Sequence, residues 1–227
     1  MSSIGIIGGI GYRATTYFYD RINALYEQKY GKGNSCPILL VSLNFKEINE
    51  LLPYEIEKVV DLITPTIKYL DQQDIASAVL VNNTMHKALD LVLNKEKSTK
   101  PYCHVGNLIH KNLDKIEKKS NVIILGTAFT MQDEYLKSFV PKKHNLINPT
   151  NEIIQQVDAL RKLYIDSTNE IATKECYKNL ITTYPDNTIF IIACTELSIA
   201  FSTIKNKTNW VDTIDLQCEA ALKTLKN

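Results

Sequence analysis

The chain is poor in arginine and carries almost no net charge. It has 26 lysines and arginines against 25 acidic residues, for a formal net charge of +1, and only Arg13, Arg21 and Arg161 are arginines. Such a balance provides no general attraction to nucleic acid or to an acidic membrane surface. Few arginines are available to bind phosphates or to read bases. The composition therefore argues against nucleic acid and membrane as partners.

Long apolar runs are also missing. No segment approaches the roughly 18–20 apolar residues that a membrane span requires. Near the N-terminus, Gly8, Gly9 and Gly11 interrupt the apolar stretch, no basic run precedes it, and no small-residue cleavage site follows. These features argue against a signal peptide, and we expect a cytoplasmic protein.

Cysteines are few and are not spaced as pairs. The five cysteines are Cys36, Cys103, Cys176, Cys194 and Cys218, and no C-x-x-C spacing occurs among them. An odd, scattered set argues against a disulfide framework or a zinc ribbon. Each cysteine is therefore by default a buried thiol, and we expect no metal site.

Short β-branched runs alternate with amphipathic stretches along the chain. Apolar runs bounded by turns are typical of strands in a parallel sheet covered on both faces. Their alternation with helices predicts an α/β architecture with right-handed crossovers. The expected strands are residues 4–7, 37–43, 77–81, 102–105, 121–125 and 188–193, and the expected helices are residues 14–30, 55–71, 85–93, 108–116, 150–169, 174–183 and 213–225.

The strand ends suggest an internal duplication. Residues 8–9 and 82–84 follow strands of the first half, and residues 126–127 and 194–196 follow strands of the second half at similar spacing. Open α/β sheets bind ligands at the carboxyl ends of their strands. We therefore expect two similar Rossmann-like lobes with parallel sheets and an active site in the cleft between them.

The lysine-rich stretch at residues 95–100 is the best boundary by composition. It predicts a first lobe of residues 1–97, joined by a returning C-terminal helix within residues 208–227. The second lobe then comprises residues 98–207.

A glycine-rich turn, Gly8-Gly9-Ile10-Gly11, follows the first strand and precedes a helix. It is not G-x-G-x-x-G, because Arg13 and Ala14 stand where the third glycine would fall, and no Gly-Lys-Ser/Thr follows. A nucleotide site is therefore not favoured. A tight turn with unusual backbone angles is expected in any case, and N–H groups at a helix N-terminus suit a carboxylate.

Two further strand ends carry reactive or polar side chains. Cys194 stands at a strand-to-helix junction, where the helix dipole is expected to lower the pKa of its thiol, although position alone also fits a structural thiol. Residues 82–84 (Asn-Asn-Thr) hold the equivalent place in the first half and can cap a helix or bind a carboxylate. His86, one turn into that helix, is either a catalytic group or a satisfied core histidine.

Together these motifs resemble the aspartate/glutamate racemase family of cofactor-independent amino-acid racemases. The resemblance spans nearly the whole chain, and its motifs are in the family's order and spacing. Residues 83–87 and 126–131 look most like the broad-specificity amino-acid racemase branch. The matching residues are Ile6-Ile7-Gly8-Gly9-Ile10-Gly11 with Ala14-Thr15, Asn83-Thr84-Met85-His86-Lys87, Leu125-Gly126-Thr127 and Cys194-Thr195-Glu196-Leu197.

The resemblance implies a two-base mechanism that uses neither pyridoxal phosphate nor metal. One thiol removes the α-proton of an amino acid and a second thiol delivers a proton to the opposite face, while hydrogen bonds to the α-carboxylate stabilise the carbanion. The resemblance also implies a homodimer. The substrate-binding residues that it implies are Gly9, Ile10, Asn83, Thr84, Thr127, Thr195 and Glu196, with His86 and Glu196 supporting the catalytic side chains or the substrate ammonium.

This chain departs from the family pattern at the first thiol. Asn82 occupies that place, and an amide is not a general base near neutral pH. Cys194 is then the expected catalytic acid/base thiol, and Asn82 stands at the catalytic position where the family has the first thiol. The alternatives are a single-cysteine decarboxylase or cis–trans isomerase of a dicarboxylate, and an amino-acid-binding protein that has lost catalysis.

The residue that recognises the substrate side chain is not fixed by the sequence. Strict aspartate racemases use cationic residues for the distal carboxylate. Arg13, Lys46, Arg161 and Lys162 stand in suitable segments, but each is most simply a solvated surface charge. A second departure from the family is Tyr12, where proline is common.

Overall fold

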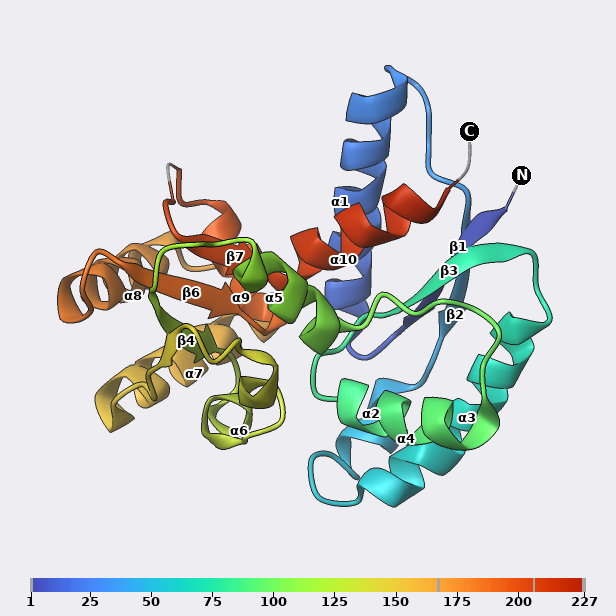
Figure 1. Ribbon diagram of the computed structural model, residues 1–227, viewed down its shortest axis with the longest axis horizontal. Helices are drawn as coiled ribbons and strands as arrows, with labels where there is room; N and C mark the ends of the chain where they lie inside the picture. Colours follow the sequence, from blue (N-terminus) through green and yellow to red (C-terminus); the bar gives the residue numbers. More distant parts are fainter. Residues whose placement is uncertain (1, 167, 206, 226–227) are drawn as a thin grey trace. The chain divides into compact units, whose positions relative to one another are not determined.

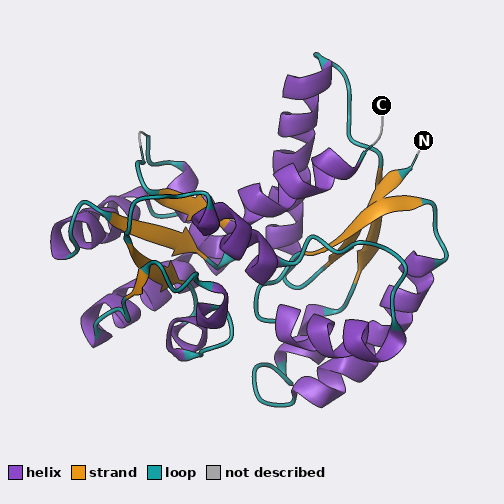
Figure 2. Ribbon diagram, in the orientation of Figure 1, coloured by secondary structure: helices purple, strands orange, loops and turns teal. Residues whose placement is uncertain are grey.

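The computed structural model describes residues 2–166, 168–205 and 207–225 and divides into two compact units. Unit 1 comprises Met1–Val105 with Ile214–Asn227, and unit 2 comprises Gly106–Thr213. Each unit has a parallel β-sheet with helices packed against it (Figures 1 and 2). The predicted α/β fold with two parallel sheets is confirmed. Residues 98–105, which composition assigns to the second lobe, lie in unit 1.

Unit 1 is built on a three-stranded sheet. Its strands are β1 (Ser3–Gly8), β2 (Ile38–Ser42) and β3 (Ile75–Leu80), in the order β2-β1-β3. Strand β1 lies in the centre, and its Ile4, Ile6 and Ile7 are at most 1% exposed. Helices α3 and α4 cover one face, and α1 lies on the other with α10 beside it (Figure 1). The helices are α1 (Tyr12–Tyr30), α2 (Phe45–Asn49), α3 (Ile56–Asp71), α4 (His86–Glu96) and α10 (Thr213–Thr224).

Unit 2 is built on a four-stranded sheet. Its strands are β4 (Asn121–Leu125), β5 (Asn145–Leu146), β6 (Thr188–Ile192) and β7 (Trp210–Asp212), in the order β5-β4-β6-β7. Every residue of β6 is buried, which explains its unbroken β-branched sequence. The helices are α5 (Val105–Asp114), α6 (Ala128–Gln132), α7 (Asn151–Asp166), α8 (Glu170–Thr183) and α9 (Thr195–Ser202), and Lys137–Phe139 form a 3₁₀ turn.

Some expected elements differ from the structure. The strand expected at 102–105 is only a bridge between Tyr102 and Ala78, and α5 already begins at Val105. The helix expected at 150–169 ends at Asp166, and the next helix, α8, begins after Asn169, whose side chain accepts a hydrogen bond from the Ala172 N–H at 3.0 Å. Within the described residues, no helix is long and apolar enough to cross a membrane.

Candidate active site

Cys194 lies in unit 2 where β6 ends and α9 begins. The thiol is 6% exposed, and its Sγ donates a hydrogen bond to Oε2 of Glu196 at 3.0 Å. The Thr195 hydroxyl donates to the same oxygen at 3.2 Å. The side chains of Cys194 and Thr195 therefore both donate to the carboxylate of Glu196, the third residue of the motif, at the carboxyl edge of the sheet.

The electrostatic environment of Cys194 disfavours the thiolate. Burial, followed by the adjacent Glu196 carboxylate and its hydrogen bond, raises the pKa of Cys194 well above its usual value, and Arg161 opposes this effect. The sequence-based expectation of a pKa lowered by the helix dipole is therefore wrong. The desolvated thiol and the negative charge beside it outweigh the dipole of the short helix α9.

A buried ion pair on α7 acts on the same thiol. Oδ1 of Asp158 accepts hydrogen bonds from Arg161 Nε at 3.0 Å and Nη2 at 2.9 Å, and Lys162 contacts Oδ2 at 2.7 Å. The side chains of Asp158 and Arg161 are only 13% and 17% exposed. Arg161 is thus not the surface charge expected from the sequence, whereas Lys162 is 65% exposed.

The role of Asp158 was not foreseen from the sequence. It also accepts a hydrogen bond from the Ala128 N–H at 3.2 Å and so ties the start of α6 to α7. Its spacing of three and four residues before Arg161 and Lys162 is that of helical ion pairs. That spacing could have identified the cluster, but not its burial.

Thr127 stands at the end of the neighbouring strand β4. Leu125 of β4 pairs with Ile192 of β6, so the segments that follow both strands leave the same edge of the sheet. The Thr127 hydroxyl accepts a hydrogen bond from the Thr130 N–H at 3.0 Å and begins α6. Unit 2 therefore brings Thr127, Cys194, Thr195 and Glu196 to the carboxyl edge of one sheet.

In unit 1 the glycine-rich turn has the tight geometry expected from the sequence. Gly9 has a φ of +86°, and a Cβ there would lie 2.2 Å from the Leu43 carbonyl oxygen, so only glycine fits. The Gly9 N–H donates to the Thr15 hydroxyl at 2.8 Å. This N–H is therefore already hydrogen-bonded within the unit, and a bound carboxylate would have to use other N–H groups at the start of α1.

Asn82 connects the two loops at the carboxyl edge of the unit 1 sheet. Its Nδ2 donates to the Ile10 carbonyl oxygen at 3.0 Å, and its Oδ1 accepts from the Met85 N–H at 3.2 Å. Both ends of the amide are thus used to hold the glycine turn against the segment that contains Asn83 and Thr84. Asn83 is 7% exposed.

His86 is fully buried, with protein partners on both ring nitrogens. Its Nε2 lies 3.1 Å from the Leu80 carbonyl oxygen, and its Nδ1 is 3.4 Å from the Val105 N–H. Burial and the neighbouring His104 lower the pKa of His86 to about 3. The imidazole is therefore neutral at physiological pH. Gln217 of α10 also contacts it, at 3.3 Å.

The described part of the chain contains no group of three or more His, Cys, Asp or Glu side chains that could hold a metal ion. A cavity of about 450 Å³ lies at the amino-terminal edge of the unit 2 sheet, away from Cys194, and residues such as Ser120, Asn187 and Trp210 line it. None of the site residues expected from the sequence lines this cavity.

No family model matches the sequence, but solved structures match it over nearly the whole chain. A candidate Asp/Glu racemase from Yersinia pestis has a TM-score of 0.83 at 22% identity and covers 100% of both chains. An aspartate racemase homologue from Pyrococcus horikoshii OT3 has a TM-score of 0.81 at 21% identity and covers 98% of both. Picrophilus torridus aspartate racemase has a TM-score of 0.78 at 19% identity and covers 99% of this chain and 94% of its own. The chain thus has the α/β fold of these racemase structures.

Proposed function

We propose that the protein is a cofactor-independent isomerase of amino acids, an aspartate/glutamate-type racemase in which Cys194 exchanges the α-proton. The observation that carries the proposal is the Cys194 thiol, hydrogen-bonded to Glu196 at 3.0 Å at the carboxyl edge of a parallel sheet. The similarity of the fold to racemase structures supports it. The motifs that resemble the broad-specificity branch favour a range of amino acids over a single one.

The proton of the resting thiol has a direct acceptor. Because its pKa is raised, Cys194 is protonated at neutral pH and must lose this proton before it can act as a base. The Glu196 carboxylate is placed to take it, which leaves a thiolate beside a neutral carboxylic acid. The thiolate then removes the α-proton of the substrate, and the electron pair passes into the α-carboxylate as an enediolate.

We propose binding and positioning roles for the remaining candidate residues. In this proposal, hydroxyl, amide and N–H groups of Ile10, Asn83, Thr84, Thr127 and Thr195 bind the substrate carboxylate. Gly9 contributes to this site through the tight turn that it forms. We assign His86 a positioning role, since its neutral ring is hydrogen-bonded to the backbone that precedes Asn83. With Asn82 in place of a thiol, protonation from the two faces of the enediolate is unequal. Exchange at the α-carbon should therefore be much faster from one enantiomer than from the other.

An exchange screen in heavy water tests this function. Each common amino acid is incubated with the protein in both configurations, and deuterium at the α-carbon is followed by NMR together with the enantiomeric ratio. We expect exchange with several amino acids and a marked preference for one configuration. Saturable binding without exchange would identify a binding protein, and release of carbon dioxide from a malonate would identify a decarboxylase. Either result would overturn the proposal.

A further inference from the structure

Gln217 is a buried polar side chain of the C-terminal helix α10. The residue is 2% exposed, and its Nε2 donates hydrogen bonds to the carbonyl oxygens of Leu80 at 3.3 Å and of Cys103 at 3.1 Å. The same nitrogen lies 3.3 Å from Nε2 of His86. One amide of α10 therefore contacts the end of strand β3, the segment that runs beside this strand and the first residue of α4.

The orientation of this amide follows from its neighbours. If it were reversed, its oxygen would face the two carbonyl oxygens of Leu80 and Cys103, and no hydrogen bond would form. The NH₂ group therefore faces both carbonyls. The tautomer of His86 follows in the same way. Its Nδ1 accepts from the Val105 N–H at 3.4 Å, so the proton is on Nε2, which donates to the Leu80 carbonyl at 3.1 Å.

The carbonyl of Leu80 is the common acceptor of these two side chains. Leu80 is the last residue of β3 and His86 is the first of α4, so the hydrogen bond between them closes the turn that contains Asn83 and Thr84. Gln217 donates to the same carbonyl from α10. It thereby fixes the base of this turn at the carboxyl edge of the sheet, where ligands of open α/β sheets bind.

A polar residue is not needed at this position for packing. The neighbours on the same face of α10 are apolar or small, and Ile214, Cys218 and Ala221 are at most 1% exposed. A buried amide costs free energy unless it is hydrogen-bonded, whereas a methionine would fill a similar space without this cost. The presence of Gln217 is therefore explained by its polar contacts.

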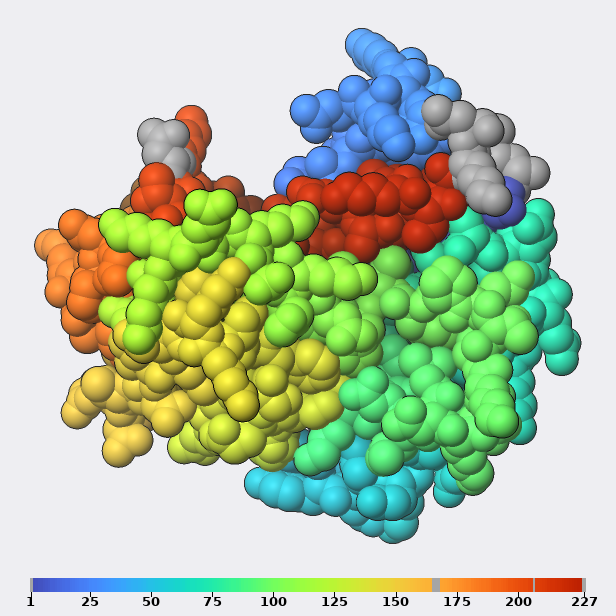
Figure 3. Space-filling model, viewed as in Figure 1, coloured from blue at the N-terminus to red at the C-terminus, as the bar shows by residue number. Residues whose placement is uncertain are grey.

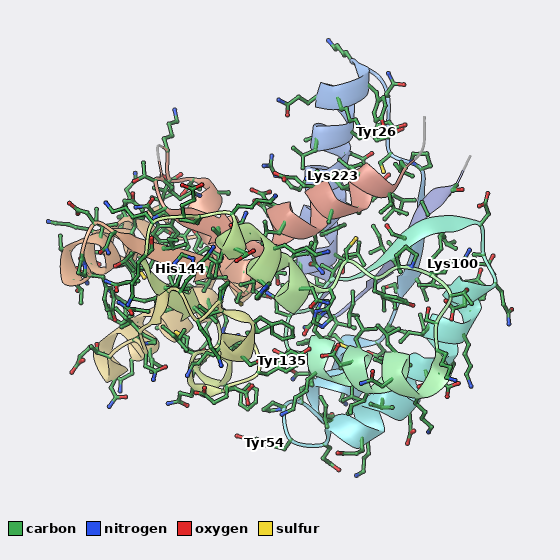
Figure 4. All side chains as sticks on the ribbon, viewed as in Figure 1. Tyr26, Tyr54, Lys100, Tyr135, His144 and Lys223 are labelled. Atoms are coloured by element: carbon green, nitrogen blue, oxygen red, sulfur yellow. The ribbon has the colours of Figure 1, made fainter. Side chains whose placement is uncertain are left out.

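Helix α10 has further attachments to unit 1, away from this turn. The Thr224 and Ser77 hydroxyls are hydrogen-bonded at 2.8 Å, and Ser77 stands three residues before Leu80, toward the amino-terminal end of β3. An ion pair also joins α10 to α1. Figure 3 shows α10 at the surface beside α1, and Figure 4 labels Lys223, the neighbour of Thr224 in the last turn. The attachment of α10 therefore does not depend on Gln217 alone.

We propose that Gln217 is a positioning residue for the substrate-binding turn of unit 1. It acts through the Leu80 carbonyl and the ring of His86, and so sets the position of Asn83 and Thr84. This role rests on the proposed function, in which these two residues bind the substrate carboxylate. Because the contacts of α10 hold the turn in place beforehand, less ordering is needed when the carboxylate binds.

Loss of the amide should weaken the binding of the substrate. In Q217M, the carbonyls of Leu80 and Cys103 lose a buried donor and the turn gains freedom. Displacement of a binding group by about 1 Å can cost about a hundredfold in rate. We expect Q217M to lose at least about tenfold in kcat/KM for α-proton exchange, with a raised KM, since a looser turn binds the carboxylate less well.

T224V is the matched control. It also removes a hydrogen bond between α10 and β3, but at the end of α10 away from the substrate-binding turn. Exchange of an amino acid found by the screen is measured in heavy water with wild type, Q217M and T224V at several substrate concentrations. T224V should keep the wild-type kcat/KM. A folded Q217M with the wild-type kcat/KM, or a T224V that loses as much as Q217M, would overturn the proposal.

NMR of the ¹⁵N-labelled chain tests the positioning without any enzymatic activity. The backbone amide resonances of Asn83 and Thr84 should shift in Q217M and stay unchanged in T224V. If no amino acid is exchanged, the proposed function fails, and these spectra still decide the role of Gln217. Asn83 and Thr84 resonances that are unchanged in Q217M would refute it.

The wild-type chain provides a measurement that does not depend on the folding of a variant. His86 is one of four histidines, so the protons on its ring nitrogens can be assigned by NMR. A single tautomer with the proton on Nε2, protected from exchange with water, would support the hydrogen-bond network around Leu80. A proton on Nδ1 would contradict this network and with it the role of Gln217.

Discussion

Replacing Glu196 by glutamine tests whether this carboxylate controls the proton of Cys194. The substitution keeps the shape of the side chain but removes its negative charge, 3.0 Å from the sulfur. Two unit charges at this distance repel by about 5 kcal/mol at an effective dielectric constant of ~20. Even a third of that energy changes the thiolate fraction by more than about tenfold. Because a neighbouring carboxylate disfavours the thiolate, its removal lowers the pKa of Cys194.

Alkylation by iodoacetamide, resolved by peptide mass spectrometry, measures this change. At mildly alkaline pH, Cys194 of E196Q should react at least about tenfold faster than in the wild type. Three other thiols give a low background, since burial raises the pKa of Cys36 and of Cys103 to about 11 and that of Cys176 to about 12. E170Q, at an exposed position on α8, serves as the control and should leave the rate unchanged. A rate in E196Q equal to or below that of the wild type would show that the Glu196 carboxylate does not raise the pKa of Cys194.

Two further predictions concern unit 1. In N82C, a thiol replaces the amide, and α-proton exchange from the slower enantiomer should increase, whereas N82A should not show this gain. Both variants should lose about 1–3 kcal/mol of unfolding free energy in urea, since both bonds of Asn82 are lost. An unchanged enantiomer preference in a folded N82C would contradict this role. For His86, the wild-type unfolding free energy should fall by up to roughly 4 kcal/mol between pH 6.5 and 3, because only the unfolded chain takes up the proton. H86Q should lose less over the same range, and an identical pH dependence would show that His86 is not buried as a neutral ring.

The central strands could be predicted from the sequence because their apolar composition indicates that they are buried. Strands such as β6 are apolar along their whole length, and only a sheet covered on both faces accommodates such a run. The edge strands β5 and β7 were missed. Their pairing depends on neighbours distant in sequence: Asn145 pairs with Asn121, and Trp210 pairs with Phe190.

The candidate site residues were proposed from motifs in the sequence, but the electrostatic environment of these residues could not be predicted in this way. The neighbours of Cys194 in sequence suggested a helix dipole, whereas its desolvation and the orientation of Glu196 depend on the packed structure. Arg161 looked like a surface charge because its spacing from Asp158 carries no information about burial. The contact between Asn82 and Ile10 joins residues 72 positions apart and could not be read from either segment.

Exchange of the α-proton by a C194A variant tests whether Cys194 is the acid/base thiol. The substrate found by the exchange screen is incubated in heavy water with wild type, C194A and C176A, and deuterium at the α-carbon is measured. Cys176 is a buried thiol of the same unit, so C176A controls for the loss of a core sulfur. We expect C194A to keep its fold and to lose about a hundredfold or more of the exchange rate, while C176A retains exchange. Exchange by a folded C194A at the wild-type rate would contradict this role of Cys194.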